Sequence, residues 1–120
     1  MGLMHLSVAV RIPGTSNGGY EALFLVDTGA TDSMAPASVL VEAGIRPIGR
    51  SSYELADGSV HDYAFGLAQI EFMGEITAGR VIFGPEGLIP ILGVTALESV
   101  GITIDPANQT VKRLPAVPLK

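Results

Sequence analysis

The sequence predicts an all-β protein built as a single domain. Fifteen glycines and eight prolines are spread along its 120 residues, where they separate short apolar runs rich in Val, Ile and Phe. Such spacing is typical of strands joined by tight turns. Apolar residues make up 48% of the chain, which is enough to form one continuous core at this length. We therefore expect one domain over residues 1–120, without a linker or an internal repeat.

The first predicted elements are two strands and a short helix. Strands at 6–12 and 20–27 are joined by a loop rich in Gly, Ser and Asn, which are residue types that favour turns. Pro36 suits the first position of a helix and Gly44 the residue after its end, which predicts a helix over 36–43. The chain thus begins as a hairpin or meander followed by one helix.

A second hairpin is centred on Asp57 and Gly58. This dipeptide supplies the two positive φ angles of a type I′ turn. It lies between residues 53–56 and 59–65, which we expect to be strands. The sequence therefore predicts a protruding β-hairpin at this point.

The remaining elements follow from apolar runs and the residues that end them. Gly93 ends one run, and Gly101 ends the helix behind it. The predicted order is strands at 67–73 and 76–83, a buried apolar run at 88–92, a helix at 94–100, and a last hairpin with strands at 102–105 and 110–114 around Pro106, Ala107 and Asn108.

The composition excludes several classes of function. The formal net charge is −5 and Lys and Arg form no cluster, so we expect no nucleic-acid partner. The chain has no cysteine, which excludes disulfides and thiolate metal sites. His5 and His61 lie far apart in sequence without other ligand-type residues around them, so we expect no metal and no cofactor.

The hydropathy pattern predicts neither a signal peptide nor a membrane span. No window approaches the roughly 20 apolar residues needed to cross a bilayer. The N-terminal residues lack a basic start followed by a long apolar stretch. We therefore expect a soluble, cytoplasmic protein with no membrane partner.

The most informative stretch is the apolar run at 23–26, which leads into Asp27 and a tight Thr28-Gly29 turn. An ionised carboxylate among apolar side chains costs several kcal/mol unless hydrogen-bond donors satisfy it. Sites of this kind shift pKa values and often carry chemistry. Asp27 is therefore the leading catalytic candidate. The residues alone leave open the alternative that Asp27 only caps a turn.

Three features together resemble the retropepsins, the single-domain, retroviral-type branch of the aspartic proteases. They are the apolar pair before the triplet at 27–29, the hairpin with a glycine turn behind it, and the apolar run at 91–93 that leads into a helix. The likeness covers about residues 6–105. It implies a closed barrel with one or two short helices and a flap hairpin, for which residues 52–62 are the candidate.

On that resemblance Asp27 is the catalytic aspartate, and Thr28 and Gly29 complete the active-site loop. The Thr28 hydroxyl suits a contact that locks two such loops together. Gly29 lets a backbone N–H approach the carboxylate without a Cβ in the way.

Aspartic protease chemistry needs two carboxylates that share one proton. One acts as a base toward a water while the other donates to the substrate carbonyl. The chain has one Asp-Thr-Gly triplet, so the second carboxylate is expected from another copy in a twofold homodimer. The resemblance thus implies a homodimeric aspartic endopeptidase with a peptide or protein substrate.

The resemblance also implies a set of substrate-binding positions before and after the loop, at the flap and in the later apolar run. Leu25, Ile89 and Ile91 are equally compatible with plain core positions, and Asp32 with a residue that satisfies a turn. The set is Leu25, Ala30, Asp32, Ala56, Asp57, Gly58, Ile89 and Ile91.

The chain departs from the retroviral pattern at two positions. Retroviral enzymes pair an aspartate just after the loop with an arginine just after the later glycine, and here these positions are Thr31 and Val94. Both halves of the ion pair are absent. We expect the dimer interface to be rebuilt on the hairpin at 102–114, as suits a cellular or bacterial retropepsin.

Two other functions remain open. A relative without catalytic activity would keep the barrel and the dimer but only bind peptide or dimerise. An unrelated small β-barrel in which Asp27 caps a turn would be a monomer.

Overall fold

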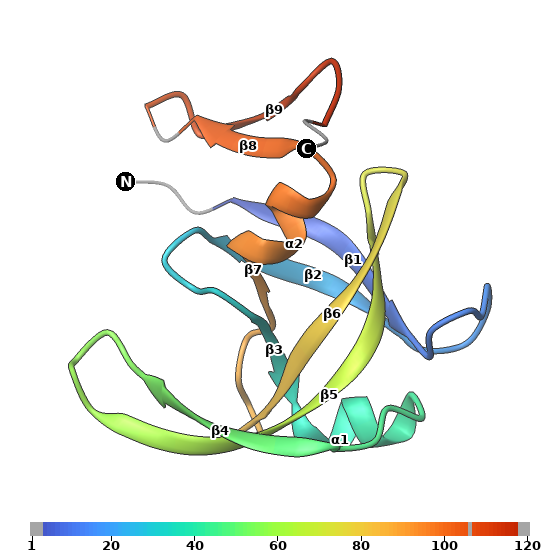
Figure 1. Cartoon of the computed structure of the whole chain (residues 1–120), viewed down its shortest axis with the longest axis vertical. Coiled ribbons are helices and arrows are strands. Elements are labelled where there is room, and N and C mark those ends of the chain that lie inside the picture. The colour runs from blue at the N-terminus through green and yellow to red at the C-terminus, as the bar shows by residue number, and fades with distance from the viewer. Residues whose placement is uncertain (1–3, 106, 118–120) are drawn as a thin grey trace.

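The computed structural model describes residues 4–105 and 107–117. Within these residues the chain forms nine strands and two short helices, which confirms the all-β prediction (Figure 1). The helices are α1 (Ala37–Glu42) and α2 (Val94–Ser99). The strands are β1 (His5–Arg11), β2 (Tyr20–Asp27), β3 (Ser33–Pro36), β4 (Gly49–Glu54), β5 (Val60–Phe72), β6 (Glu75–Gly84), β7 (Ile91–Gly93), β8 (Ile102–Asp105) and β9 (Thr110–Arg113).

Six of these strands close into a barrel. Hydrogen-bonded neighbours run in the order β1-β2-β7-β3-β6-β5-β4, and a further pairing of β1 with β5 closes the ring, which leaves β4 as an added strand on β5. The β2–β7 and β3–β6 pairs are parallel, whereas β1–β2, β4–β5 and β5–β6 are antiparallel. Closure removes free edges from a sheet. Among the described strands of this sheet, β4 is therefore the one that has an unpaired edge.

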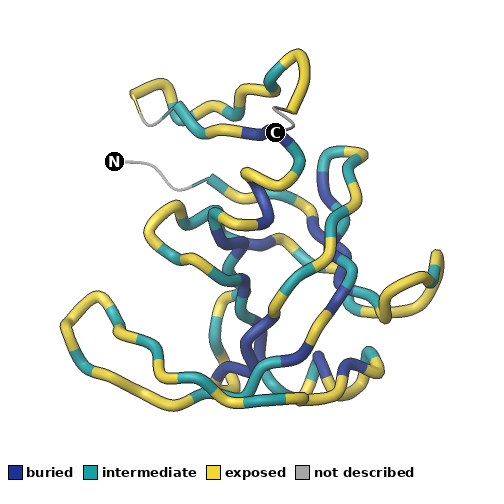
Figure 2. Tube along the Cα trace, viewed as in Figure 1, coloured by how far each residue is buried: buried dark blue, intermediate teal, exposed yellow. Residues whose placement is uncertain are grey.

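The core fills the barrel and reaches beneath both helices (Figure 2). Each large apolar side chain buried there contributes about 1.5–3 kcal/mol. α1 contributes Leu40 and α2 contributes Leu97, so each helix packs on the barrel through one apolar side. The largest fully buried side chains are Val8, Val10, Phe24, Leu40, Ile70, Val81, Leu92, Leu97 and Ile102.

The elements at the two ends of the predicted order agree closely with the sequence. The strands predicted at 6–12 and 20–27 are β1 and β2, and the helices predicted at 36–43 and 94–100 are α1 and α2 with slightly shorter bounds. Pro36 is the residue before α1 rather than its first turn, because it also ends β3. The sequence did not predict β3, whose four residues form a strand only by pairing with β6 and β7.

The strands predicted at 59–65 and 67–73 are wrong as separate elements, because β5 runs through both without a break. Gly66 lies between the two predicted ranges. In the structure a Cβ at Gly66 would lie 2.6 Å from the Arg46 carbonyl oxygen, so glycine permits a close backbone approach inside a continuous strand.

The prediction of a buried apolar run at 88–92 is also wrong. Ile89 is 61% exposed, and in this run only Leu92 is fully buried. β7 begins at Ile91, directly after Pro90. Proline has no N–H to give to a ladder, while its carbonyl oxygen accepts the Leu25 N–H at 2.8 Å.

The hairpin of β4 and β5 is confirmed, but its first arm is Gly49–Glu54 rather than the predicted 53–56, and its turn is not type I′. Gly58 has φ +86°, and among the described non-glycine residues Asp57 is not one of those with positive φ. The Leu55 carbonyl accepts the Gly58 N–H at 2.9 Å, and the Leu55 N–H donates to the Ser59 carbonyl at 2.8 Å. The turn therefore has the form in which a glycine in the left-handed region follows the central residues and makes a bulge.

The last hairpin forms a separate two-stranded sheet. β8 and β9 pair with each other, and Pro106 in the turn predicted between them lies outside the described residues. Ile104 and Val111 pack against the core, and the Leu114 N–H donates to the Gly101 carbonyl at 2.8 Å. No helix among the described residues is long and apolar enough to cross a membrane.

Candidate active site

Asp27 is the last residue of β2, and the parallel register places it beside Gly93 of β7. A tight turn follows, closed by the Ala30 N–H, which donates to the Asp27 carbonyl at 3.1 Å. The Gly29 N–H donates to Asp27 Oδ1 at 3.0 Å, and a Cβ on Gly29 would lie 3.3 Å from that oxygen. The loop thus holds the carboxylate with a backbone donor, as predicted for Gly29, and leaves it partly exposed.

Backbone hydrogen bonds anchor the segment after this turn to the start of α2. The Val94 N–H donates to the Ala30 carbonyl at 2.8 Å, and the Thr95 N–H to the Thr31 carbonyl at 3.2 Å. These bonds join the two segments that carry the departures at Thr31 and Val94. Main-chain contacts therefore fix the loop at the place where the retroviral pattern has an ion pair.

Ser33 is a structural residue of the site that the sequence analysis did not identify. It is 2% exposed, and its hydroxyl accepts the Gly93 N–H at 3.0 Å. A Cβ on Gly93 would lie 2.6 Å from the carbonyl carbon of Asp32. The only available sequence signal was a serine next to an apolar run, which is too common to indicate a buried hydrogen bond.

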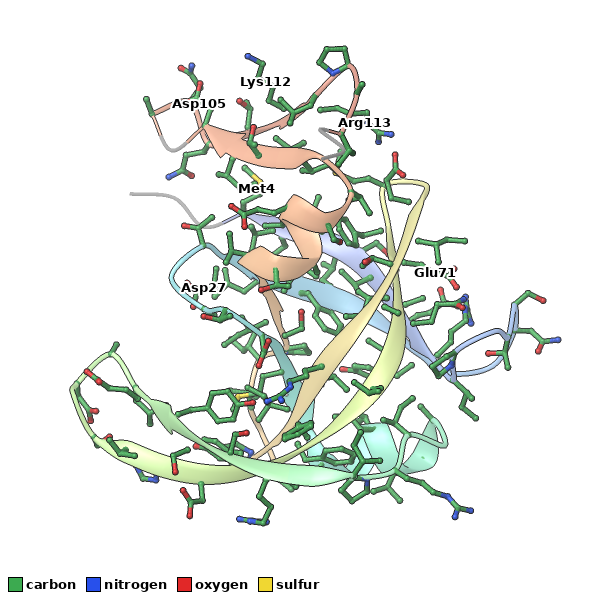
Figure 3. All side chains as sticks on the ribbon, viewed as in Figure 1. Met4, Asp27, Glu71, Asp105, Lys112 and Arg113 are labelled. Atoms are coloured by element: carbon green, nitrogen blue, oxygen red, sulfur yellow. The ribbon has the colours of Figure 1, made fainter. Side chains whose placement is uncertain are left out.

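A cleft of about 790 Å³ opens beside Asp27, between the loop and the hairpin of β4 and β5. Figure 1 shows the loop after β2 and the turn between β4 and β5 projecting to the same side of the molecule, and Figure 3 shows Asp27 on that side. The cleft is lined by Asp27, Gly29, Ala30, Thr31, Asp32, Met34, Ser52, Tyr53, Glu54, Leu55, Ala56, Tyr63, Ile82 and Ile91.

The structure brings part of the predicted site together. Of the predicted substrate-binding positions, the cleft lining includes Ala30, Asp32, Ala56 and Ile91. Thr28, Leu25, Asp57, Gly58 and Ile89 lie outside that lining. Core packing does not explain Ile89, which is mostly exposed, and Leu25 and Ile91 are half-buried.

Tyr53 and Tyr63 are cleft residues that the sequence analysis missed. Their ring centroids lie 6.3 Å apart, and the His61 ring stacks on Tyr63 with centroids 6.2 Å apart. The Tyr53 hydroxyl donates to Asp32 Oδ2 at 3.1 Å. Asp32 therefore bonds to the candidate flap rather than only satisfying its own turn. In sequence, Tyr53 on one arm of a predicted hairpin and His61 and Tyr63 at alternate positions on the other were the available signal.

No metal site is formed by the residues that the structure describes, where no three His, Asp or Glu side chains gather in a way that holds an ion. The carboxylates that line the cleft are Asp27, Asp32 and Glu54, and its lining has no Lys or Arg. The cleft therefore offers acid–base groups and hydrogen-bond acceptors together with aromatic and aliphatic surface.

Asp57 stabilises the turn of the candidate flap. Its Oδ1 accepts the Ser59 hydroxyl at 2.6 Å and the Ser59 N–H at 2.9 Å. The hydroxyl first, and then the N–H, lower the pKa of Asp57 below its ordinary value of 3.8. Because the folded-state pKa is lowered, the turn gains stability above the ordinary pKa and loses it as pH falls through the lowered value.

Ser59→Ala is expected to raise the pKa of Asp57 toward 3.8, since the hydroxyl is the larger cause of the shift and the backbone donor remains. A titration of the side-chain carboxyl carbons by NMR measures this change directly. Asp105 is the internal control, because Asn108 lowers its pKa in a separate turn and the substitution leaves that turn intact. A wild-type Asp57 that titrates at or above its ordinary value would contradict the turn geometry.

Comparisons with known proteins agree with this geometry. The family described as aspartyl protease matches residues 12–96. No curated protein matches the chain significantly. The family match spans most of the barrel. The alternative that the chain is an unrelated β-barrel, in which Asp27 only caps a turn, is therefore wrong.

Solved structures of three proteases or protease-like domains share the fold. The simian foamy virus (mac) protease is 17% identical with a TM-score of 0.56, over 78% of this chain and 91% of that one. The EIAV protease complexed with the inhibitor HBY-793 is 16% identical with a TM-score of 0.62, over 87% and 93%. The retroviral protease-like domain of Ddi1 from Leishmania major is 15% identical with a TM-score of 0.59, over 97% and 91%.

These likenesses lie below the identity at which activity transfers between proteins, so what they establish is the fold. The chain has the closed barrel of the retropepsin-like proteases, and by the match over residues 12–96 it belongs to the aspartyl protease family.

Proposed function

We propose that the chain is a homodimeric aspartic endopeptidase, in which Asp27 and the partner's Asp27 activate the water that hydrolyses a peptide bond. The observation that carries the proposal is the Asp27 carboxylate at the edge of the cleft, oriented by the Gly29 N–H at 3.0 Å. Membership of the aspartyl protease family supports the same assignment.

The need for a second copy follows from the other aspartates of the chain. Asp32 accepts the Tyr53 hydroxyl, and Asp57 and Asp62 accept serine hydroxyls within the hairpin. Asp105 accepts N–H groups in the turn after β8. None of them ends a strand in a second Asp-Thr-Gly loop, so a twofold axis beside Asp27 is the route to a matched pair of carboxylates.

Two carboxylates held close together cannot both ionise easily, so the pair shares one proton. The ionised member takes a proton from the water as its oxygen attacks the carbonyl carbon. The protonated member donates its proton to the carbonyl oxygen. Collapse of the tetrahedral intermediate then breaks the carbon–nitrogen bond and returns a proton to the leaving amine.

The candidate flap supports a peptide as the substrate. The hairpin of β4 and β5 extends beyond the closed barrel and forms one wall of the cleft. An extended peptide laid beneath it would gain main-chain hydrogen bonds like an added strand. Closure over the peptide would also exclude bulk water from the reacting groups.

The sheet of β8 and β9 is the proposed dimer interface. Within the described residues its strands pair only with each other, so both outer edges are free to pair with a second copy. Figure 3 shows Asp105, in its turn, toward the same side of the molecule as Asp27. A twofold axis on that side would bring both features to one interface.

Incubation with an unfolded protein or a peptide mixture at mildly acidic pH tests the proposed function. We expect internal cleavage that pepstatin inhibits, because a transition-state analogue binds far more tightly than substrate. Cleavage that resists pepstatin or persists without Asp27 would overturn the proposal. A folded dimer that binds peptide without cleaving it would instead indicate the inactive relative.

A further inference from the structure

We propose that Tyr53 is a positioning residue that fixes the candidate flap over the cleft through its hydrogen bond to Asp32. The kinetic consequences of this role rest on the proposed protease function, whereas its structural consequences do not. Tyr53 lies on β4, outside the loop of Asp27.

The tyrosine ring is held by its neighbours on the hairpin. Tyr53 lies opposite His61 in the register of β4 and β5, and Ser51 lies opposite Tyr63, so all four side chains share one face of the hairpin. Tyr63 lies near both the Tyr53 and the His61 rings, with centroid separations of 6.3 and 6.2 Å. This packing directs the Tyr53 hydroxyl toward the barrel rather than into solvent.

The acceptor belongs to the most firmly anchored part of the site. Asp32 lies between Thr31, whose carbonyl accepts the Thr95 N–H, and Ser33, whose buried hydroxyl accepts the Gly93 N–H. Its backbone also packs against Gly93 too closely to admit a Cβ. The Asp32 carboxylate is therefore a well-anchored hydrogen-bond acceptor for a side chain of the hairpin.

The hydrogen bond is an isolated connection. Among the residues described by the structure, it is the only side-chain hydrogen bond that joins residues 52–62 to any part of the chain outside β4 and β5. The other side-chain bonds of this segment, such as Ser52 to Asp62 and Ser59 to Asp57, stay within the hairpin. Loss of the Tyr53 hydroxyl would leave the flap attached only through its strands.

The bond is longer than is usual for its type. Hydroxyl–carboxylate bonds are usually 2.5–2.7 Å long, whereas this one is 3.1 Å and half-buried. We therefore expect an effect of a few-fold to about tenfold rather than a larger one. Such a bond favours the position of the flap over the cleft.

Amide relaxation by NMR tests the structural role, in the Asp27→Asn background so that no chain is cleaved. With Tyr53→Phe, we expect order parameters at residues 55–59 to fall from about 0.8 to below about 0.6. Tyr20→Phe is the matched control, because it removes the same atom from a ring that packs on Phe24 far from the cleft. It is expected to leave these values unchanged.

Two substitutions at the other end of the bond complete the test. Asp32→Ala removes the acceptor and should reproduce the mobility of Tyr53→Phe, while Asp32→Asn retains an acceptor oxygen and should restore most of the order. The double variant Tyr53→Phe with Asp32→Ala should be no more mobile than either single one. Unchanged order parameters in both Tyr53→Phe and Asp32→Ala would overturn the proposal.

In the active chain, Tyr53→Phe is expected to raise KM about three- to tenfold with kcat changed less than about twofold, because peptide binding must then order the flap. A fall in kcat with unchanged KM would contradict a positioning role. Should the wild-type chain cleave no peptide, the proposed function fails, while the relaxation experiment still decides the role of Tyr53.

Discussion

Asp27→Asn is expected to lower kcat/KM for a cleaved peptide about a thousandfold or more, because the amide neither accepts the proton of water nor shares one with the partner's carboxylate. The substitution preserves the size of the side chain. In the wild type the Gly29 N–H donates to Asp27 Oδ1, and the amide oxygen of the asparagine can accept the same N–H. We therefore expect the fold and the melting temperature to stay close to those of the wild type. Steady-state kinetics and thermal unfolding measure the two effects separately.

Glu42→Gln is the matched control for this variant. Glu42 is exposed at the end of α1, remote from the cleft lining, and the change likewise converts one carboxylate to an amide. Its activity should equal that of the wild type. An Asp27→Asn chain that folds normally and retains more than about a tenth of the activity would exclude Asp27 from general acid–base catalysis.

Gly93→Ala is expected to destabilise the fold by about 3 kcal/mol, at the upper end of what overpacking usually costs. The new Cβ would lie 2.6 Å from the Asp32 carbonyl carbon and 2.7 Å from the carbonyl oxygens of Asp32 and Thr31. These are backbone atoms, and the Thr31 carbonyl oxygen accepts the Thr95 N–H of α2. Gly93 itself is held by its N–H, which donates to the Ser33 hydroxyl, so the loop must move to admit the Cβ. Because Gly93 is also the register partner of Asp27, the substitution should reduce activity as well as stability.

Gly79→Ala serves as the comparison, since Gly79 lies in β6 with ordinary φ, and a Cβ added there would have no neighbouring atom within 4 Å. Alanine there should be neutral or stabilise the fold by up to about 1 kcal/mol. Urea unfolding measures the change in unfolding free energy of both variants, from the shift in the midpoint urea concentration when the slope m stays constant. Equal stabilities for the two variants would contradict the packing of β7 against the loop of Asp27.

The geometry of the Asp27 loop could be predicted from the sequence because it is set by local residues. The order of Asp27, Thr28 and Gly29 after an apolar strand determines where the carboxylate lies and which N–H orients it. The hairpin around Gly58 was likewise predicted from turn residues, although the left-handed position proved to be Gly58 alone.

Features that depend on distant contacts could not be predicted in the same way. β3 exists only through its pairing with β6 and β7, and Ser33 becomes important only where β7 brings the Gly93 N–H to it. The cleft contact of Tyr53 needs the curvature of the hairpin over Asp32. None of these partners is close in sequence, so periodicity and turn chemistry carry no signal for them.

The most direct test of the paired-aspartate mechanism is a mixing experiment. The Asp27→Asn variant is added to a constant concentration of the wild-type chain, under conditions where subunits exchange, and peptide cleavage is measured. If each active site needs one Asp27 from each copy, a ninefold excess of the variant should reduce peptide cleavage to about one tenth, because nine in ten wild-type chains then have an inactive partner. Cleavage that stays unchanged as the variant is added would contradict the mechanism, since it would mean that a single chain carries a complete site.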